Sequence, residues 1–258
     1  MSPDFIDTHC HFDFPPFSGN ELESLALAEQ AGVRRIIVPT VTADRFARVL
    51  KLARDYPPLF AALGLHPLYI AQHQEAELEQ LAGFLASRPQ KLVAVGEIGL
   101  DLYMEDPQFE RQQRLLKAQL KLAKEYDLPV ILHSRRSHDQ LAAMLRRAEL
   151  PRRGVVHGFA GSLSQAQAFI RLGYYIGVGG TISYERAQKT RSVMAQLPLT
   201  SLLLETDAPD MPLAGYQGQP NRPERAAEVF QVLCQLRPES PDQIAAQLQH
   251  NTHALFTF

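Results

Sequence analysis

The strongest constraint on the fold is a regular alternation of short apolar segments with longer amphipathic ones along the 258 residues. Eight apolar segments are predicted strands, at 5–7, 35–39, 60–64, 93–97, 130–133, 155–157, 175–178 and 202–205. Between them, apolar residues such as Leu116, Leu120 and Ala123 recur at three and four spacing, as on a helix with one buried face. The alternation predicts a parallel α/β fold, either a closed barrel or an open doubly wound sheet.

The predicted helices follow the strands without a break in composition. They lie at 22–31, 45–54, 75–87, 109–125, 139–147 and 163–172, with a final helical region at 224–236 and 242–248. No repeat or low-complexity tract divides the chain, so we expect one domain over residues 1–258. The Pro- and Gly-rich stretch 209–223 is predicted to be a long functional loop.

Charge and composition exclude several classes of protein. The formal net charge of -2 gives no general field that would coat duplex DNA, so any contact with nucleic acid must come from a local patch. No apolar run reaches the length of a membrane span, and we see no secretory signal pattern. Cys10 and Cys234 make no disulfide framework. We therefore expect a cytoplasmic protein with no membrane contact and no obligate protein partner.

His9 and His11 follow the first apolar segment in a His-x-His pattern. Side chains two residues apart on an extended strand share a face, so both imidazoles can point at one spot. Two neutral imidazoles make half of a metal site. Taken alone, such a pair is more often two ordinary histidines than a metal site.

Further metal-binding residue types lie at the ends of other predicted strands. Glu97 ends the fourth, His133 the fifth and His157 the sixth, while Glu205 and Asp207 end the eighth. In parallel α/β proteins the carboxyl ends of the strands form the functional face. The pattern therefore predicts one cluster of imidazoles and carboxylates at one rim.

This donor set indicates divalent metal ions. Imidazole and carboxylate without thiolate suit Zn²⁺, Mn²⁺ or a similar ion. Six ligands are too many for one catalytic zinc that keeps an open position. They fit two ions that one carboxylate bridges.

The motifs together resemble the TatD family of metal-dependent hydrolases. They are residues 7–11 (DTHCH), 64–67 (GLHP), 96–101 (GEIGLD), 133–135 (HSR), 157–159 (HGF) and 205–207 (ETD). Residues 177–181 (GVGGT) and 219–223 (QPNRP) look like the YjjV branch of that family. The resemblance covers essentially the whole chain.

The resemblance implies an amidohydrolase-like (β/α)8 TIM barrel, two divalent cations and hydrolysis of ester bonds, with deoxyribonuclease activity in some members. It implies that His9, His11, Glu97 and Asp207 hold one ion. Glu97 would also hold the second ion together with His133 and His157. The identity of the ions, among Zn²⁺, Mn²⁺ and Mg²⁺, stays open.

A hydrolytic mechanism follows as a hypothesis. Asp207 would orient the attacking water and take its proton, while Glu97 bridges the ions. Arg135 and Arg222 are candidates to grip a substrate phosphate, although either could be a solvated surface arginine. His66 is a candidate to bind substrate or orient water. Glu205 is either a supporting residue, a ligand of a further ion or part of an ion pair.

The expected substrate is nucleic acid or a small phosphoester. One alternative is an amidohydrolase or lactonase that acts on a small carboxylic or cyclic substrate. Such enzymes often bridge their metals with a modified lysine, where this chain has Glu97. Another alternative is a metal-binding or nucleic-acid-binding protein without turnover, which would not need the extra acid Asp207.

Overall fold

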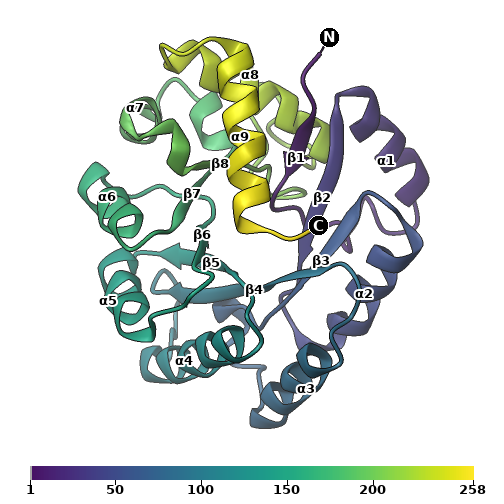
Figure 1. Cartoon of the computed structure of the whole chain (residues 1–258), viewed down its shortest axis with the longest axis vertical. Coiled ribbons are helices and arrows are strands. Elements are labelled where there is room, and N and C mark those ends of the chain that lie inside the picture. Colours follow the sequence, from purple (N-terminus) through teal and green to yellow (C-terminus); the bar gives the residue numbers. More distant parts are fainter. Residues whose placement is uncertain (1) are drawn as a thin grey trace.

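The computed structural model describes residues 2–258. Eight strands form one parallel sheet in chain order. They are β1 Phe5–Asp7, β2 Val33–Pro39, β3 Leu59–Leu63, β4 Leu92–Asp101, β5 Val130–Arg135, β6 Gly154–Val156, β7 Tyr175–Val178 and β8 Leu202–Leu204. In Figure 1 the strands surround a central axis and the helices lie outside them.

The first and last strands meet and close the sheet. The backbone N–H of Thr8 donates to the carbonyl of Leu204 at 3.1 Å. Beyond the strands, the Asp207 N–H donates to the His9 carbonyl and the His11 N–H to the Ala208 carbonyl, both at 2.8 Å. The structure is therefore a (β/α)8 barrel, and the predicted alternative of an open sheet is wrong.

The helices cover the outside of the barrel. They are α1 Glu21–Gln30, α2 Phe46–Asp55, α3 Glu75–Ala86, α4 Phe109–Glu125, α5 His138–Ala148, α6 Leu163–Arg171, α7 Gln188–Gln196, α8 Ala226–Leu236 and α9 Pro241–Leu255. The sequence did not predict α7, because its nine residues carry too few apolar side chains for a helical repeat. Its inner side is nevertheless buried, through the side chains of Thr190, Val193 and Met194. No helix within residues 2–258 is both long and apolar enough to cross a membrane.

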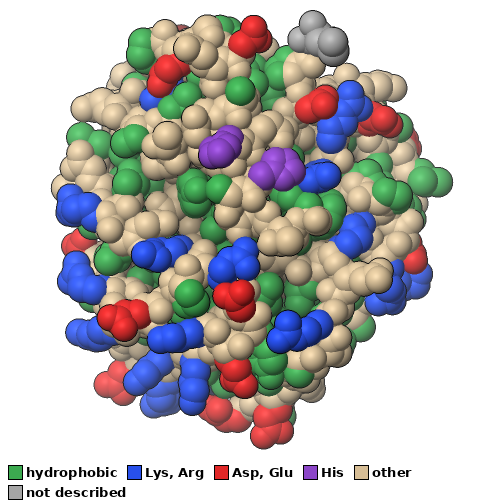
Figure 2. Space-filling model, viewed as in Figure 1, with side chains coloured by type: hydrophobic (Ala, Val, Ile, Leu, Met, Phe, Trp, Pro, Cys, Tyr) green, Lys and Arg blue, Asp and Glu red, His purple; other side chains and the backbone are tan. Residues whose placement is uncertain are grey.

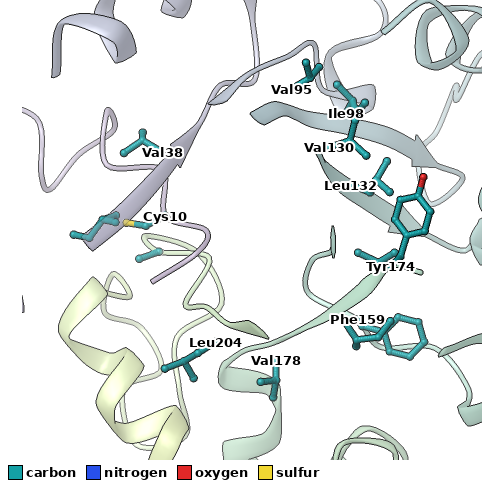
Figure 3. Close-up of a cluster of buried hydrophobic side chains, with 14 of the residues drawn as sticks. Cys10, Val38, Val95, Ile98, Val130, Leu132, Phe159, Tyr174, Val178 and Leu204 are labelled. Atoms are coloured by element: carbon teal, nitrogen blue, oxygen red, sulfur yellow. The ribbon is translucent and has the colours of Figure 1, made fainter. Parts of the chain in front are cut away.

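Apolar side chains form two layers because successive residues of a strand face opposite ways. Those that face outward pack against the helices, and Figure 3 draws part of this layer, with Val38, Leu132, Val178 and Leu204. Those that face inward, such as Ile131, fill the barrel. The inner layer also includes Val155 and Leu203. A site inside the barrel can therefore lie only above this layer, toward one end.

The C-terminal segment closes the end of the barrel where the strands begin. Leu255 and Phe256 belong to the inner apolar layer, and Phe258 packs against it. The guanidinium of Arg35, near the start of β2, lies 4.8 Å from the centre of the Phe258 ring. Figure 1 shows α9 and the chain end in front of this end of the barrel. The opposite end, where the strands finish, remains for the functional site.

His138, at the start of α5, gives a pH-dependent contribution to stability. Its ring packs edge-on against Phe159, and its buried Nε2 has no hydrogen-bond partner among residues 2–258. Burial and the charge of Lys189 lower the pKa of His138 to about 4. Between the ordinary pKa of about 6.5 and this value, the unfolded chain binds a proton that the folded chain does not, so stability falls as the pH falls.

The wild-type protein loses stability between pH 7 and pH 4. Replacing His138 with Leu is expected to make this loss smaller by about 2 kcal/mol. Urea denaturation at both pH values measures this difference. The same substitution at His250, an exposed residue of α9, is the control and should leave the loss unchanged. Equal pH dependence in the His138 variant and the wild type would contradict this account.

Candidate metal centre

The predicted metal-binding residues meet at the carboxyl ends of the strands. Residues two apart on a strand face the same side. Because Ile131, Val155 and Leu203 face into the barrel, the residues two positions later also face inward, namely His133, His157 and Glu205. The same region holds seven of the predicted residues close together, namely His9, His11, His66, Glu97, His133, His157 and Asp207. The strand ends thus bring together side chains that lie up to 198 positions apart in the printed sequence.

Glu97 is the centre of this cluster and is buried. Its Oε2 lies 3.1 Å from His9 Nε2 and 3.2 Å from His11 Nε2. Its Oε1 lies 2.6 Å from His157 Nε2 and 3.3 Å from His133 Nδ1. One carboxylate therefore faces two separate sets of imidazoles with its two oxygens.

The surroundings of Glu97 keep it ionised. Burial alone would raise the pKa of its carboxyl, but the surrounding histidines, with His66 and His157 foremost, outweigh burial and hold that pKa well below its usual range. Glu97 was expected to end its strand, whereas β4 continues to Asp101 and pairs with β5 up to Arg135. The extension matters because it places a second carboxylate, that of Asp101, near His133.

Asp207 lies at the outer side of the cluster. Its Oδ1 is 3.4 Å from His9 Nε2 and 3.5 Å from His11 Nε2, and its side chain is 21% exposed. Burial would raise the pKa of this carboxyl, but the hydrogen bond from His11 and the charge of His157 lower it. An ionised carboxylate at the open side of the cluster can accept a proton from a bound water.

The donor geometry fits divalent metal ions better than a hydrogen-bonded network. His157 Nε2 lies 2.6 Å from Glu97 Oε1, yet it makes no hydrogen bond with any described residue because the two groups are misaligned. The rings of His9 and His157 stack in parallel with centres 3.7 Å apart, which disfavours charging both. Burial and the facing His157 lower the pKa of His9. Burial would lower the pKa of His11, His133 and His157, but the facing carboxylates raise it, so bound cations would take the place of the protons on these nitrogens.

His66 lies in the cluster but its tautomer makes it a donor. Burial lowers its pKa to about 4, so the ring is neutral near pH 7. The N–H of Leu68 donates to His66 Nδ1 at 3.0 Å, which places the ring proton on Nε2. That Nε2 faces Glu97 Oε1 at 3.0 Å. His66 is close enough to Glu97 and His133 to share an ion, but its Nε2–H donates to the carboxylate instead.

Asp101 is the residue of the cluster that the sequence analysis missed. Its carboxylate is buried, and its Oδ2 lies 2.6 Å from His133 Nε2. The N–H of Tyr103 donates to its other oxygen at 2.8 Å. A proton on His133 Nε2 leaves the Nδ1 lone pair free to face Glu97, as a carboxylate–histidine–metal arrangement requires. Asp101 shares a strand face with Glu97, a signal that ending the predicted strand at Glu97 obscured.

Glu205 lies behind His157. Its Oε1 accepts a hydrogen bond from the Gly158 N–H and is 3.8 Å from His157 Nδ1. A Cβ on Gly177 would lie 2.5 Å from its other oxygen, so that glycine makes room for the carboxylate. Glu205 thus faces the outer nitrogen of a candidate ligand.

The two predicted phosphate-binding arginines have different surroundings. Arg222 forms an ion pair with Glu224, and its guanidinium lies 5.5 Å from the centre of the Phe17 ring. Arg135 is exposed at the end of β5, two residues after His133, and has no ion-pair partner among residues 2–258. Arg135 is therefore the freer of the two.

Gly99 allows β4 to approach His133 closely. It has φ +151°, and a Cβ there would lie 1.9 Å from the His133 carbonyl oxygen. Replacing Gly99 with Ala is expected to lower the free energy of unfolding by at least about 3 kcal/mol, which urea denaturation measures.

Gly83 of α3 is the matched control, because a Cβ there meets nothing within 4 Å. Replacing Gly83 with Ala should raise stability by about 0.5 to 1 kcal/mol. A Gly99→Ala variant as stable as the wild type would contradict the close approach of the two strands.

The chain is similar to known proteins over nearly its whole length. The family model of TatD-related DNases matches residues 6–257. The metal-dependent hydrolase YjjV of Escherichia coli K12 is 69% identical over 98% of this chain and 97% of its own length. A crystal structure of the YjjV TatD homologue superimposes with a TM-score of 0.97, covering 98% of this chain and 97% of that one.

A more distant relative carries an activity in its name. The 3'-5' ssDNA/RNA exonuclease TatD of Salmonella typhimurium is 31% identical over 93% of this chain and 94% of its own length. With the family match and the convergent cluster of imidazoles and carboxylates, this likeness identifies the chain as a metal-dependent hydrolase that belongs to the TatD family.

Proposed function

We propose that the protein hydrolyses phosphodiester bonds of nucleic acid with a pair of divalent metal ions. The observation that carries the proposal is the position of Glu97, whose two oxygens face two separate sets of imidazoles. A bridging carboxylate between two cations offsets their repulsion, which makes this arrangement suitable for a two-ion centre.

The candidate ligands divide into two sets around this carboxylate. His9, His11 and Asp207 share Oε2 of Glu97, while His133 and His157 share Oε1. Mixed imidazole and carboxylate ligands favour Zn²⁺ or Mn²⁺ over Mg²⁺, which prefers oxygen. Asp101 orients His133 through a hydrogen bond, and Glu205 faces His157 Nδ1 at 3.8 Å. Such ions, when bound, would polarise the phosphate and lower the pKa of a nearby water.

Two residues of the chain assist the attack of water on the phosphate, Asp207 as proton acceptor and His66 as support for Glu97. Asp207, ionised and partly exposed, accepts a proton from the attacking water. The water oxygen forms a bond to phosphorus, the bond from phosphorus to the ester oxygen breaks, and the leaving oxygen takes up a proton. The products are a phosphomonoester and a hydroxyl group. His66 keeps the Glu97 carboxylate in place by donating to it.

Nucleic acid is proposed as the substrate from two observations. The Salmonella typhimurium relative is named a 3'-5' ssDNA/RNA exonuclease. Within this chain, Arg135 presents an exposed guanidinium two residues beyond His133 at the same strand end. A guanidinium beside the cluster suits a phosphate, which accepts two parallel hydrogen bonds from it.

The test is hydrolysis by purified protein that has been stripped of metal and reloaded with Mn²⁺, Zn²⁺ or Mg²⁺. The substrates are bis(p-nitrophenyl) phosphate, end-labelled single-stranded DNA, and a panel of lactones and amides. We expect turnover of both phosphodiesters and none of the panel. His9→Ala should abolish it, whereas His250→Ala, an exposed control on α9, should not. Hydrolysis of the lactones or amides alone would overturn the proposal in favour of an amidohydrolase.

A further inference from the structure

The charges of the chain divide strongly between two parts of the barrel. Residues 109–196, from the start of α4 to the end of α7, hold 15 Lys and Arg against six Asp and Glu, whereas the rest holds 11 against 22. Figure 2, which views the end of the barrel where the strands begin, shows Lys and Arg side chains gathered at the lower left, where Figure 1 places α4 to α6. The small net charge therefore conceals a basic sector that can attract a polyanion.

At the rim of this sector, two arginines gather around one exposed tyrosine. The guanidinium carbon of Arg135 lies 4.0 Å from the centre of the Tyr103 ring, and that of Arg136 lies 4.2 Å from it. Tyr103 is 50% exposed. Within residues 2–258, neither arginine forms an ion pair, and Glu105 and Asp106 on the same loop as Tyr103 pair with neither.

The backbone fixes this arrangement beside the metal centre. The Tyr103 N–H donates to Asp101, which also accepts from His133. Arg135 lies in β5 two residues beyond His133, and Arg136 has φ +53°, an uncommon conformation for a residue with a side chain. Two like charges thus lie side by side on the surface, and one of them, Arg136, adopts an uncommon backbone conformation.

We propose that Arg135 and Arg136, held by Tyr103, form a clamp for a phosphate of the substrate strand that neighbours the scissile one. Each guanidinium can make paired hydrogen bonds to phosphate oxygens. Because both arginines lie over Tyr103, that ring serves to position them rather than to stack on a base. The clamp rests on the proposed nuclease function. It further implies that the nucleic-acid strand leaves the site on the side of the barrel formed by β4 and β5.

The test measures binding and turnover separately. Binding of 5'-fluorescein-labelled dT2 and dT8 is followed by anisotropy on the Asp207→Asn background, which limits cleavage. We expect R135A/R136A to bind dT8 at least about 10-fold more weakly and to lower the salt dependence of binding by about 0.7 in log–log slope, the value for one neutralised phosphate. Hydrolysis of bis(p-nitrophenyl) phosphate by the double variant with Asp207 intact should fall by a smaller factor than hydrolysis of dT8, because that substrate has no second phosphate.

Matched variants separate the clamp from simple charge loss. R48A/R54A removes two exposed arginines from α2, outside the basic sector, and should leave dT8 binding nearly unchanged. Tyr103→Phe should keep the affinity, and Tyr103→Leu should weaken it. Equal losses in the two double variants, or unchanged dT8 binding in R135A/R136A, would overturn the clamp. Absence of phosphodiester turnover in the wild type would instead overturn the nuclease function, since binding is measured independently.

Discussion

Replacing Asp207 with Asn is expected to reduce turnover of a phosphodiester by about 10³-fold while the protein keeps part of its metal. The amide has nearly the same shape as the carboxylate but cannot accept the proton of the attacking water. His9 and His11 remain in place with Glu97 to hold an ion. Steady-state kinetics together with metal analysis of the same preparation measure both effects.

Asp210 provides the matched control for this substitution. It is an exposed carboxylate three residues further along the same loop, and its N–H donates to the Asp207 carbonyl. Asp210→Asn removes an equal charge near the site and should retain activity within about threefold. Equal losses in the two variants would indicate a general electrostatic effect and would remove the proposed role of Asp207.

Replacing Glu97 with Gln is expected to lower kcat/KM by at least about 10³-fold, because the charged bridge between two cations contributes several kcal/mol. In contrast to Asp207→Asn, this change should also reduce bound metal below two ions per chain. The reason is that both sets of imidazoles depend on the same carboxylate. Metal analysis after dialysis distinguishes the two variants.

The control for Glu97→Gln is Glu105→Gln, an exposed carboxylate on the loop that follows β4. It should keep both its metal and its activity. Retention of two tightly bound ions by Glu97→Gln would show that Glu97 is not the bridge, even if activity fell.

Much of the fold was predictable because the barrel is built from locally encoded units. Each strand is a short apolar run and most helices carry a clear apolar repeat, so the eight strands were predicted close to their observed positions. Helix α7 was missed because Val193 and Met194 are its main apolar side chains, too few to show a helical repeat. The closure of the barrel depends on hydrogen bonds between Thr8 and Leu204, which no local pattern reveals.

The cluster of candidate ligands was predictable for a different reason. Parallel strands finish at one end, so histidines and carboxylates at strand ends must lie near one another. The roles of the residues around them depend on hydrogen bonds that the sequence does not specify. The bond from Leu68 decides that His66 is a donor, and the one to Asp101 orients His133. Likewise, the pairing of Arg222 with Glu224 sets it apart from Arg135.

The most direct test of the two-ion centre is a titration of metal-free protein with Mn²⁺, in which bound metal and hydrolysis of bis(p-nitrophenyl) phosphate are measured in the same samples. Glu97 as a bridge predicts that activity reaches its maximum only when two ions are bound per chain. Full activity with one bound ion, or binding of two ions without any hydrolysis of the phosphodiester, would contradict it.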